Sequence, residues 1–366
     1  MEQIYLKRLN RFYSWMEKNQ LQGALITTPA NIYYFTNFYS NPHERFMGLF
    51  LQKNQEPILI LPELDLGEAK NSTFLKHLYG YSDSEGPEST IIKHINTNLD
   101  LPFGFETGII SFKKVLWLKQ ILNILNVVDI ENALMDLRLA KDEIELSYMK
   151  EAGRWADKAI QIGINAVQIG KSELEIIAEI EFQLKKQGIE RMSFDTLVLT
   201  GEKSALPHGK PGKETVKKGD FVLFDLGVVV NGYCSDISRT IIVGSPTDKQ
   251  KEIYLTVKNA QQSAIEEVRP NIPLKQIDLA ARNYITEKGF GDYFIHRIGH
   301  GLGLDIHESP SVHDGNDSLI TSGMVFTVEP GIYLPDIGGV RIEDDIYVSL
   351  DRAELLTSFT KELIEL

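Results

Sequence analysis

One apolar stretch that carries two carboxylates constrains the fold of this chain more than any other feature. Residues 221–240 read FVLFDLGVVVNGYCSDISRT, and the Asn231-Gly232 pair favours a hairpin with a two-residue turn. When the strands pair directly across this turn, Asp225 and Asp236 point to the same face as diagonal neighbours. A buried carboxylate is costly unless a positive group compensates its charge. The hairpin therefore either exposes this face to solvent or holds a cation there.

Three further ligand-type side chains follow downstream. His300 lies in the Gly-rich segment GHGLGLDIHESP, Glu329 ends the apolar run in MVFTVEPGIYLP, and Glu343 interrupts a similar run in GGVRIEDDIYV. A loop of odd length around residues 335–338 would return the chain with Glu329 and Glu343 on the same sheet face. This recurrence of carboxylates within apolar strands favours the cation over a solvated surface.

Four carboxylates and one imidazole form a ligand set for metal ions. The candidates are Asp225, Asp236, His300, Glu329 and Glu343. Two divalent cations would neutralise the four carboxylates. Oxygen-rich ligands with one imidazole favour manganese, while cobalt, iron and zinc stay open because ligand type discriminates poorly. A water molecule shared between two such ions has a lowered pKa and is a nucleophile near neutral pH, so the pattern predicts hydrolytic chemistry.

The composition is typical of a globular protein without a polyanionic partner. The chain has 366 residues, of which 43% are hydrophobic and 24% charged, and a net charge of −13. This charge disfavours nucleic acid and anionic membranes as partners. The first residues lack an apolar signal-peptide core, and no run is long enough to span a bilayer. A single cysteine, Cys234, excludes an internal disulfide, and we expect a cytoplasmic enzyme or binding protein.

The length favours two domains, with a boundary within residues 132–140. The first, taken as residues 1–135, shows a helical pattern over residues 1–20 and short apolar runs bounded by turn residues, typical of an α/β domain. The strand candidates are residues 23–28, 47–51, 57–63 and, more weakly, 103–106, with a further helix candidate at 111–125. The charged, helix-prone stretch 137–153 lies near the start of the second domain, taken as residues 136–366.

The second domain contains a weak internal repeat. Residues 156–190 resemble residues 260–292, and each copy reads as a helix, a turn with Gly or Pro, and a second amphipathic helix. Ser172 and Glu175 form a capping-box pattern at the second helix of the first copy. Two such helix pairs, each leading into strands, would pack about a pseudo-twofold axis with the site between them.

Five segments together resemble those of the dinuclear metallopeptidases of the pita-bread fold. They are FDLGVVVNGYCSDISRT, LPHGKPG, GHGLGLDIHESP, FTVEPGIY and GVRIEDD. TPANIYYFTNF, NPHERF and LRLAKDEIEL resemble the creatinase-type N-terminal domain and its junction. The chain looks most like the creatinase/prolidase type, and within it bacterial Xaa-Pro dipeptidase (prolidase). The resemblance implies an α/β creatinase-like N-terminal domain and an α+β pita-bread catalytic domain with a pseudo-twofold internal repeat.

The resemblance also implies roles for individual residues. The five candidate ligands match the family's metal ligands in type, and Asp236 and Glu343 match those that bridge both metals. His208 and His307 match substrate-facing histidines, and Arg341 matches an arginine that lines the pocket.

The expected reaction is hydrolysis of the peptide bond before proline in Xaa-Pro dipeptides, by attack of a metal-bridging hydroxide on the carbonyl carbon. The metals and either His307 or His208 would stabilise the developing oxyanion. Glu329 would carry the proton from the water to the proline nitrogen.

A dipeptidase also needs a group that binds the carboxylate directly after the proline. Arginine suits this task because it offers paired donors, and Arg341 and Arg297 are the candidates in the catalytic domain. His43 and Arg45 in NPHERF could reach the site of a neighbouring subunit in a homodimer, or they could belong to an ordinary charged loop.

Two other functions stay open. Xaa-Pro aminopeptidase activity on longer peptides would use the same metal centre. A non-catalytic protein could use the fold for binding alone, but such relatives are expected to lose metal ligands, and all five are present here.

Overall fold

The computed structural model describes residues 2–97 and 101–366 and divides into two compact units, Met1–Arg138 and Leu139–Leu366. Each unit buries its own apolar side chains. Within the described residues, no helix has the length and apolar character needed to cross a bilayer.

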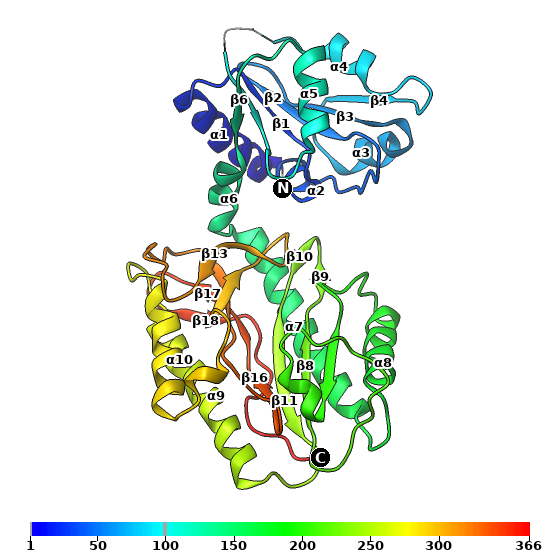
Figure 1. Ribbon diagram of the computed structural model, residues 1–366. Coiled ribbons are helices and arrows are strands. Elements are labelled where there is room, and N and C mark those ends of the chain that lie inside the picture. Colours follow the sequence, from blue (N-terminus) through cyan, green and yellow to red (C-terminus); the bar gives the residue numbers. More distant parts are fainter. Residues whose placement is uncertain (1, 98–100) are drawn as a thin grey trace. The chain divides into compact units, whose positions relative to one another are not determined.

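The N-terminal unit is built on one mixed six-stranded sheet (Figure 1). Its strands are β1 (Gly23–Ile26), β2 (Gly48–Gln52), β3 (Ile58–Pro62), β4 (His77–Tyr81), β5 (Phe103–Phe105) and β6 (Val127–Asp129). Their order is β4-β3-β2-β1-β5-β6, with β1 antiparallel to β2 and parallel to β5. The four predicted strands are confirmed. β4 and β6 lie at the two edges and are largely half-buried, so they have no continuous apolar run to reveal them.

Six α-helices and one short 3-10 helix belong to the described part of the chain up to residue 139. They are α1 (Glu2–Lys18), α2 (Pro29–Thr36), η1 (Glu63–Asp65), α3 (Leu66–Ser72), α4 (Glu88–His94), α5 (Phe112–Ile121) and α6 (Glu131–Leu139), with α7 following directly. The predicted first helix is confirmed, and α1 buries Leu9, Phe12 and Met16 along one face, as their helical spacing indicates.

The helix-prone stretch 137–153 is broken where α6 gives way to α7 (Glu143–Ala166). Ala140 pairs with Met324 in an isolated bridge. Asp142 then accepts two backbone hydrogen bonds from the first turn of α7 and completes a capping box. The break arises because an aspartate in this position satisfies the free N–H groups of a new helix start.

The C-terminal unit, Leu139–Leu366, is called the catalytic unit after its expected function. It contains two helix pairs, as the internal repeat predicts. They are α7 with α8 (Glu173–Lys186), and α9 (Asp248–Glu267) with α10 (Lys275–Glu287); two short 3-10 helices are η2 (Gly201–Ala205) and η3 (Gly291–Tyr293). The capping box of Ser172 and Glu175 is confirmed at α8. Figure 1 shows α8 on one side of the unit, α9 and α10 on the other, and strands between them.

The strands of this unit form several small antiparallel sheets. They are β7 (Leu197–Thr200), β8 (Phe221–Leu226), β9 (Val229–Val230), β10 (Tyr233–Cys234), β11 (Ile237–Ile242), β12 (Gly299–Gly301), β13 (Glu308–Val312), β14 (Val325–Val328), β15 (Gly331–Leu334), β16 (Gly338–Arg341), β17 (Asp344–Val348) and β18 (Ala353–Leu355). The orders are β11-β8-β7, β13-β12-β14-β17-β18, β10-β9 and β15-β16. One core packs α7 and α8 against β8 and β11, and the other packs α9 and α10 against β14 and β17.

The register predicted for the first hairpin is confirmed. Val230 pairs with Tyr233 across the turn, and Asp225 pairs with Ser238 further along the same hairpin. Asp236 therefore shares a sheet face with Asp225.

The second hairpin has the predicted odd-length loop, residues 335–337, between Leu334 and Gly338. On one side of Glu329 and Glu343, Gly331 of β15 pairs with Arg341 of β16. On the other side, Val328 of β14 pairs with Asp344 of β17. Glu329 and Glu343 consequently face each other between these two ladders.

Candidate active site

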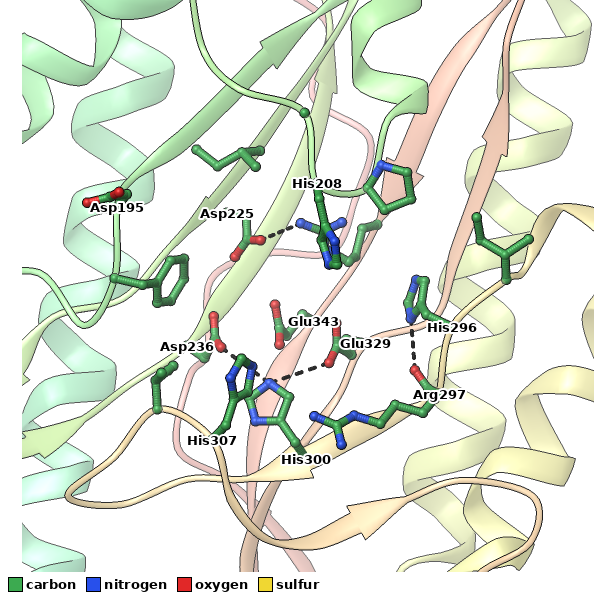
Figure 2. A pocket seen from close by; sticks show the side chains of 17 residues that line it. Asp195, His208, Asp225, Asp236, His296, Arg297, His300, His307, Glu329 and Glu343 are labelled. Atoms are coloured by element: carbon green, nitrogen blue, oxygen red, sulfur yellow. Dashed lines mark hydrogen bonds and ion pairs between the residues drawn. The ribbon is translucent and has the colours of Figure 1, made fainter. Parts of the chain in front are cut away.

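One cavity of about 580 Å³ in the catalytic unit collects most of the side chains that the sequence singles out (Figure 2). It is lined by all five candidate metal ligands, both candidate substrate-facing histidines and both arginines proposed for substrate binding in this unit, namely Asp225, Asp236, His300, Glu329, Glu343, His208, His307, Arg297 and Arg341. These residues come from widely separated parts of the sequence, so the fold alone brings them together.

The first hairpin supplies two carboxylates. Asp225 lies in β8, and Asp236 lies just before β11. Asp236 is only 5% exposed, and its backbone N–H donates to Asp345 Oδ2 at 2.9 Å. The Oδ1 atom of Asp236 is buried without a hydrogen-bond partner among the described residues. Because a buried acceptor without a partner is costly, this atom marks a position for a positive group.

His300 presents one ring nitrogen to the carboxylates. Its Nδ1 lies 3.1 Å from the carbonyl oxygen of Gly301 and donates to it, so Nε2 is left as the nitrogen with a free lone pair. This Nε2 atom is 3.7 Å from Asp236 Oδ2 and 3.5 Å from Glu329 Oε1. One ligand atom each of Asp236, His300 and Glu343 lies within 4.8 Å of the other two.

Hydroxyl groups orient the two glutamates of the second hairpin. Ser238 Oγ donates to Glu343 Oε2 at 2.7 Å, and Thr327 Oγ1 donates to Glu329 Oε1 at 3.3 Å. Ser238 stands directly opposite Asp225 in the first hairpin, so the two hairpins meet at this hydroxyl.

Crowding and burial shift the protonation of these groups strongly. Burial raises the pKa of Asp236 well above its usual range, and the nearby Glu343 and Asp225 carboxylates raise it further. Burial likewise raises the pKa of Glu343, with Glu329 and Asp225 adding to the effect, and it raises the pKa of Glu329 to about 7. Burial lowers the pKa of His300 to about 3, so this imidazole is neutral and can act as a ligand.

This donor set fits divalent cations. Several carboxylates converge with a neutral imidazole, and the orphaned Oδ1 of Asp236 lies among them. Like charges this close destabilise each other unless positive charge sits between them, and divalent ions bound by carboxylate and imidazole provide that charge. Metal binding would therefore relieve the repulsion that raises the pKa values of Asp236 and Glu343.

Arg341 compensates part of the negative charge, and it does so from a buried position. It is 4% exposed. Its guanidinium donates to Asp225 Oδ2, to Ser238 Oγ at 2.8 Å and to Tyr333 Oη at 2.9 Å. The arginine thus lines the cavity as expected, with most of its donors directed to protein groups.

Two residues near the site escaped the sequence analysis, Tyr333 and His296. Tyr333 Oη lies 2.9 Å from His296 Nε2, while His296 Nδ1 lies 2.8 Å from the carbonyl oxygen of Arg297 and donates to it. Burial lowers the pKa of His296 to about 4 and raises that of Tyr333 to about 12, so both are neutral. The sequence did hold a signal for Tyr333, which lies four residues after Glu329 and hence on the same strand face.

The remaining predicted groups of this unit stand around the ligand cluster. The ring centroids of His307 and His300 are 4.3 Å apart at 80°, and burial lowers the pKa of His307. His208 follows η2 in a loop and lines the cavity. Arg297 Nη1 donates to Ser311 Oγ at 2.9 Å. Figure 2 shows these three side chains lying around the cluster of Asp236, His300 and Glu343.

His43 and Arg45 lie in the N-terminal unit and line a different cavity, of about 280 Å³. Arg45 donates two hydrogen bonds to the carboxylate of Asp83, at 2.8 and 2.9 Å. His43 has a positive φ of 55°, and its backbone N–H donates to Asn41 Oδ1. Their predicted reach into a neighbouring subunit stays a prediction.

Comparison with protein families finds two matches in this chain. Residues 147–349 match the model of metallopeptidase family M24, and residues 8–140 match the creatinase/prolidase N-terminal domain. The first match contains all five candidate ligands, together with His208, His307, Arg297 and Arg341.

Individual proteins are similar over almost the whole chain. YkvY of Bacillus subtilis, itself assigned only provisionally as a dipeptidase, is 45% identical over 362 residues, covering 98% of this chain and 99% of its own. The structure of an Xaa-Pro dipeptidase from Bacillus anthracis is 35% identical with a TM-score of 0.92, covering 99% of this chain and 100% of that one. The structure of an X-Pro aminopeptidase from Thermotoga maritima is 30% identical with a TM-score of 0.88, covering 96% and 100%.

The matches cover both units, and the buried ligand cluster falls inside the peptidase match. The chain therefore belongs to metallopeptidase family M24 and begins with a creatinase/prolidase N-terminal domain.

Proposed function

We propose that this protein hydrolyses Xaa-Pro dipeptides with the help of two divalent cations. The observation that supports this most directly is the buried cluster of Asp236, His300 and Glu343, which shares one cavity with Asp225 and Glu329. The similarity to an Xaa-Pro dipeptidase over the whole chain supports the substrate class.

The five candidate ligands would hold the metal ions. Bound divalent cations lower the pKa of a water molecule and polarise the substrate carbonyl. We propose manganese, because oxygen ligands with one imidazole suit it; cobalt, zinc and iron are the alternatives that the metal panel below tests.

Glu329 is the proposed proton carrier. Burial raises the pKa of its carboxyl to about 7 in the metal-free protein. A carboxylate held beside the attacking water can accept a proton from it and pass the proton on. It lies 3.5 Å from His300 Nε2, within the ligand cluster. A proton taken from the attacking water would pass through this carboxylate to the proline nitrogen, which leaves as an amine.

His307 and His208 are the proposed donors to the developing oxyanion. Burial lowers the pKa of His307, so its ring is neutral and can donate a hydrogen bond through N–H. Both side chains line the cavity beside the ligand cluster. Such preorganised donors stabilise the negative charge of the transition state without having to reorient.

Arg297 is the proposed anchor of the substrate carboxylate. Arg341 donates hydrogen bonds to Asp225, Ser238 and Tyr333. Within the part of the chain that the structure describes, Arg297 donates one side-chain hydrogen bond, to Ser311. A guanidinium with uncommitted donors can bind a carboxylate in a paired fashion. Arg297 would in this way restrict the enzyme to peptides that end directly after proline.

Xaa-Pro aminopeptidase activity on longer peptides is the second candidate, supported by the similarity to the aminopeptidase from Thermotoga maritima. The two activities differ in whether a residue may follow the proline. An Xaa-Pro-Xaa tripeptide assayed beside the Xaa-Pro dipeptide separates them.

We also propose a homodimer in which His43 and Arg45 act on the site of the neighbouring subunit. Unchanged turnover and KM in Arg45→Ala would reject this role.

The test of the function uses metal-stripped protein that is resupplied with manganese, cobalt, zinc or iron. We expect hydrolysis of Xaa-Pro dipeptides to return, most strongly with manganese, and to exceed hydrolysis of the matched tripeptides. A protein that binds the metals yet cleaves neither substrate would contradict the proposed function.

A further inference from the structure

The loop between β12 and β13 carries His307 to the wall of the cavity. No hydrogen bond from the described part of the chain reaches the His307 ring, whereas Nδ1 of the adjoining His300 is held by the Gly301 carbonyl. The ring has an edge-on contact with His300, at 4.3 Å between ring centroids. The position of His307 therefore depends on how its loop is held.

Glu308, the residue after His307, contacts both this loop and Lys141 through its side chain. Its Oε1 accepts a hydrogen bond from the Asp305 N–H at 3.0 Å, and its Oε2 lies 3.1 Å from Lys141 Nζ. The side chains of Lys141 and Glu308 are 1% and 7% exposed, so this ion pair is almost fully withdrawn from water.

The loop also packs directly onto the pair. A Cβ on Gly303 would lie 2.8 Å from Glu308 Oε1 and 3.0 Å from Lys141 Cε, so only glycine fits there without displacing them. The Gly303 N–H donates to the Asp305 carbonyl at 3.0 Å, and the Gly303 carbonyl accepts from the Cys234 N–H at 2.7 Å. The ion pair is thus a central contact of the loop.

Lys141 is itself held by the strand that leads to Glu329. Its backbone N–H donates to the Gly323 carbonyl at 2.8 Å, just before β14 begins at Val325. The lysine therefore projects from fixed backbone towards Glu308 and links the Glu329 strand to the His307 loop.

We propose that the buried Lys141–Glu308 ion pair positions His307, an inference that rests on the proposed function of this histidine. Neither side chain lines the cavity, so both would act through the loop. Removing one partner takes away the opposite charge that the other faces in this buried pair, which is destabilising, and the loop then shifts to admit water. Since a displacement of about 1 Å can cost about a hundredfold in rate, the effect falls on catalysis more than on binding through Arg297.

The test compares Lys141→Met in two backgrounds of the metal-loaded enzyme. We expect this substitution to lower kcat about 10- to 100-fold with a change in KM below about threefold. In the His307→Ala background we expect less than about a threefold further loss, because the group on which the lysine acts is already gone. Lys141→Arg, which keeps the charge, should retain most of the activity.

A matched control is Lys258→Met. Lys258 also pairs with a glutamate, Glu362, but the two side chains are 26% and 76% exposed. Exposed pairs contribute little, so kcat should stay unchanged. Metal content is measured in every variant and should also stay unchanged, which separates an effect on His307 from a loss of the metal site.

Histidine-ring NMR of the metal-free protein gives a readout that needs no catalysis. The ring resonance of His307 is assigned by its absence from the spectrum of His307→Ala. We expect Lys141→Met to shift this resonance. The ring resonance of His77, in the N-terminal unit, is the control and should not shift.

The proposal would be overturned if Lys141→Met lowered kcat equally with His307 present and in His307→Ala, or if it left the His307 resonance unmoved. The ion pair would then stabilise the fold in general and not position His307. If Lys141→Met does not fold, Glu308→Gln goes through the same comparison with the same criteria. If the unmodified enzyme cleaves no Xaa-Pro dipeptide, the proposed function fails, while the NMR comparison still decides whether the pair holds His307.

Discussion

Single residues in this site carry charges that the protein alone does not balance. Asp236 and Glu343 are 5% and 2% exposed, and burial together with neighbouring carboxylates raises the pKa of both. Arg341 offsets Asp225, but Asp236 keeps a buried oxygen without a partner among the described residues. The chemical identity of these residues therefore predicts how the protein responds to pH and to metal.

The first prediction concerns thermal stability as a function of pH. Burial raises the pKa of Glu329 from 4.5 to about 7, so the folded metal-free protein keeps a proton that the unfolded chain has already released. The metal-free protein should lose stability as the pH rises through this window, because the folded state binds more protons than the unfolded one. Metal needs the ionised carboxylates, so the increase in Tm on adding manganese should grow over the same window.

Thermal melts of metal-stripped protein with and without manganese, from about pH 5 to about pH 8, measure this directly. A matched series in calcium controls for ionic strength, because calcium prefers sites made of oxygen ligands alone. A manganese effect that is constant across the window would show that the carboxylates of the site are not the groups that titrate.

The second prediction concerns the substrate carboxylate. Replacing Arg297 with methionine should raise KM for Xaa-Pro dipeptides about 10- to 100-fold, with a smaller change in kcat, because a charge-assisted hydrogen bond to the substrate is lost. Steady-state kinetics checks this. A dipeptide with an amidated C-terminus is the control, since it lacks the carboxylate and should distinguish the two enzymes little. An unchanged KM for the free dipeptide would assign carboxylate binding to another group.

At the scale of residues, the sequence predicts which side chains belong to the site better than it predicts which groups they contact. Asp225, Asp236, His300, Glu329 and Glu343 stand out because acids and an imidazole interrupt apolar strands, and all five line one cavity. Sequence cannot tell that Arg341 is directed to Asp225 and Tyr333, because those contacts depend on how two separate hairpins meet. His296 likewise gives no signal, since its partner Tyr333 is far along the chain.

At the scale of elements, both ligand-bearing hairpins are interrupted where the ligands lie. Asp236 separates β10 from β11, Glu329 separates β14 from β15, and Glu343 separates β16 from β17. Pro330, which follows Glu329, has no N–H to continue the ladder. These three carboxylates therefore lie at breaks between strands, whereas Asp225 lies within β8.

The Asn231-Gly232 turn and the odd-length loop predict the two registers correctly because turn chemistry is local. The interruptions could not be predicted in the same way, because they depend on contacts between the two hairpins, such as the hydrogen bond from Ser238 to Glu343. The break before α7 was missed for a related reason. Ala140 leaves the helix to pair with Met324, far along the chain.

The third prediction concerns the support behind β17. Arg239 is 2% exposed. Its guanidinium donates to Asp344 Oδ1 at 2.7 Å and to the carbonyl oxygens of Glu343 and Phe359, so it ties a ligand strand to the C-terminal segment. Arg239→Met should destabilise the metal-free protein by about 3 kcal/mol, because Asp344 then loses one partner of a buried ion pair. Metal affinity should fall as well, because the backbone of Glu343 is released.

Urea unfolding and metal titration measure the two effects. Arg269→Met is the matched control, because Arg269 pairs with Glu267 at an exposed position and should change stability by at most about 1 kcal/mol. Metal affinity that is unaffected in Arg239→Met would remove the proposed link between this support and Glu343.

At the scale of the whole molecule, two units carry separate cores. A core of the N-terminal unit packs strands of its six-stranded sheet against α4 and α5, and the catalytic unit has one core for each helix pair. Length and the change in sequence pattern were enough to predict two domains. The internal repeat predicts that each helix pair packs against its own strands. It does not predict that these strands are divided among several small sheets.

The fourth prediction follows from the location of the ligands. All five candidates lie within Leu139–Leu366, so metal should stabilise that unit and not the other. Calorimetry of the full chain should show two unfolding transitions, of which manganese raises one by mass action. The metal-insensitive transition is the internal control. A single transition that moves as a whole would contradict independent units.

The central claim is that acids from two hairpins and one imidazole bind a pair of metal ions, and metal analysis at equilibrium tests it most directly. After dialysis of stripped protein against manganese, we expect about two ions per chain, and a clear loss of bound metal in Asp236→Asn, because this substitution removes a buried carboxylate charge from the proposed ligand set. No bound metal, or binding that ignores Asp236→Asn, would contradict the claim.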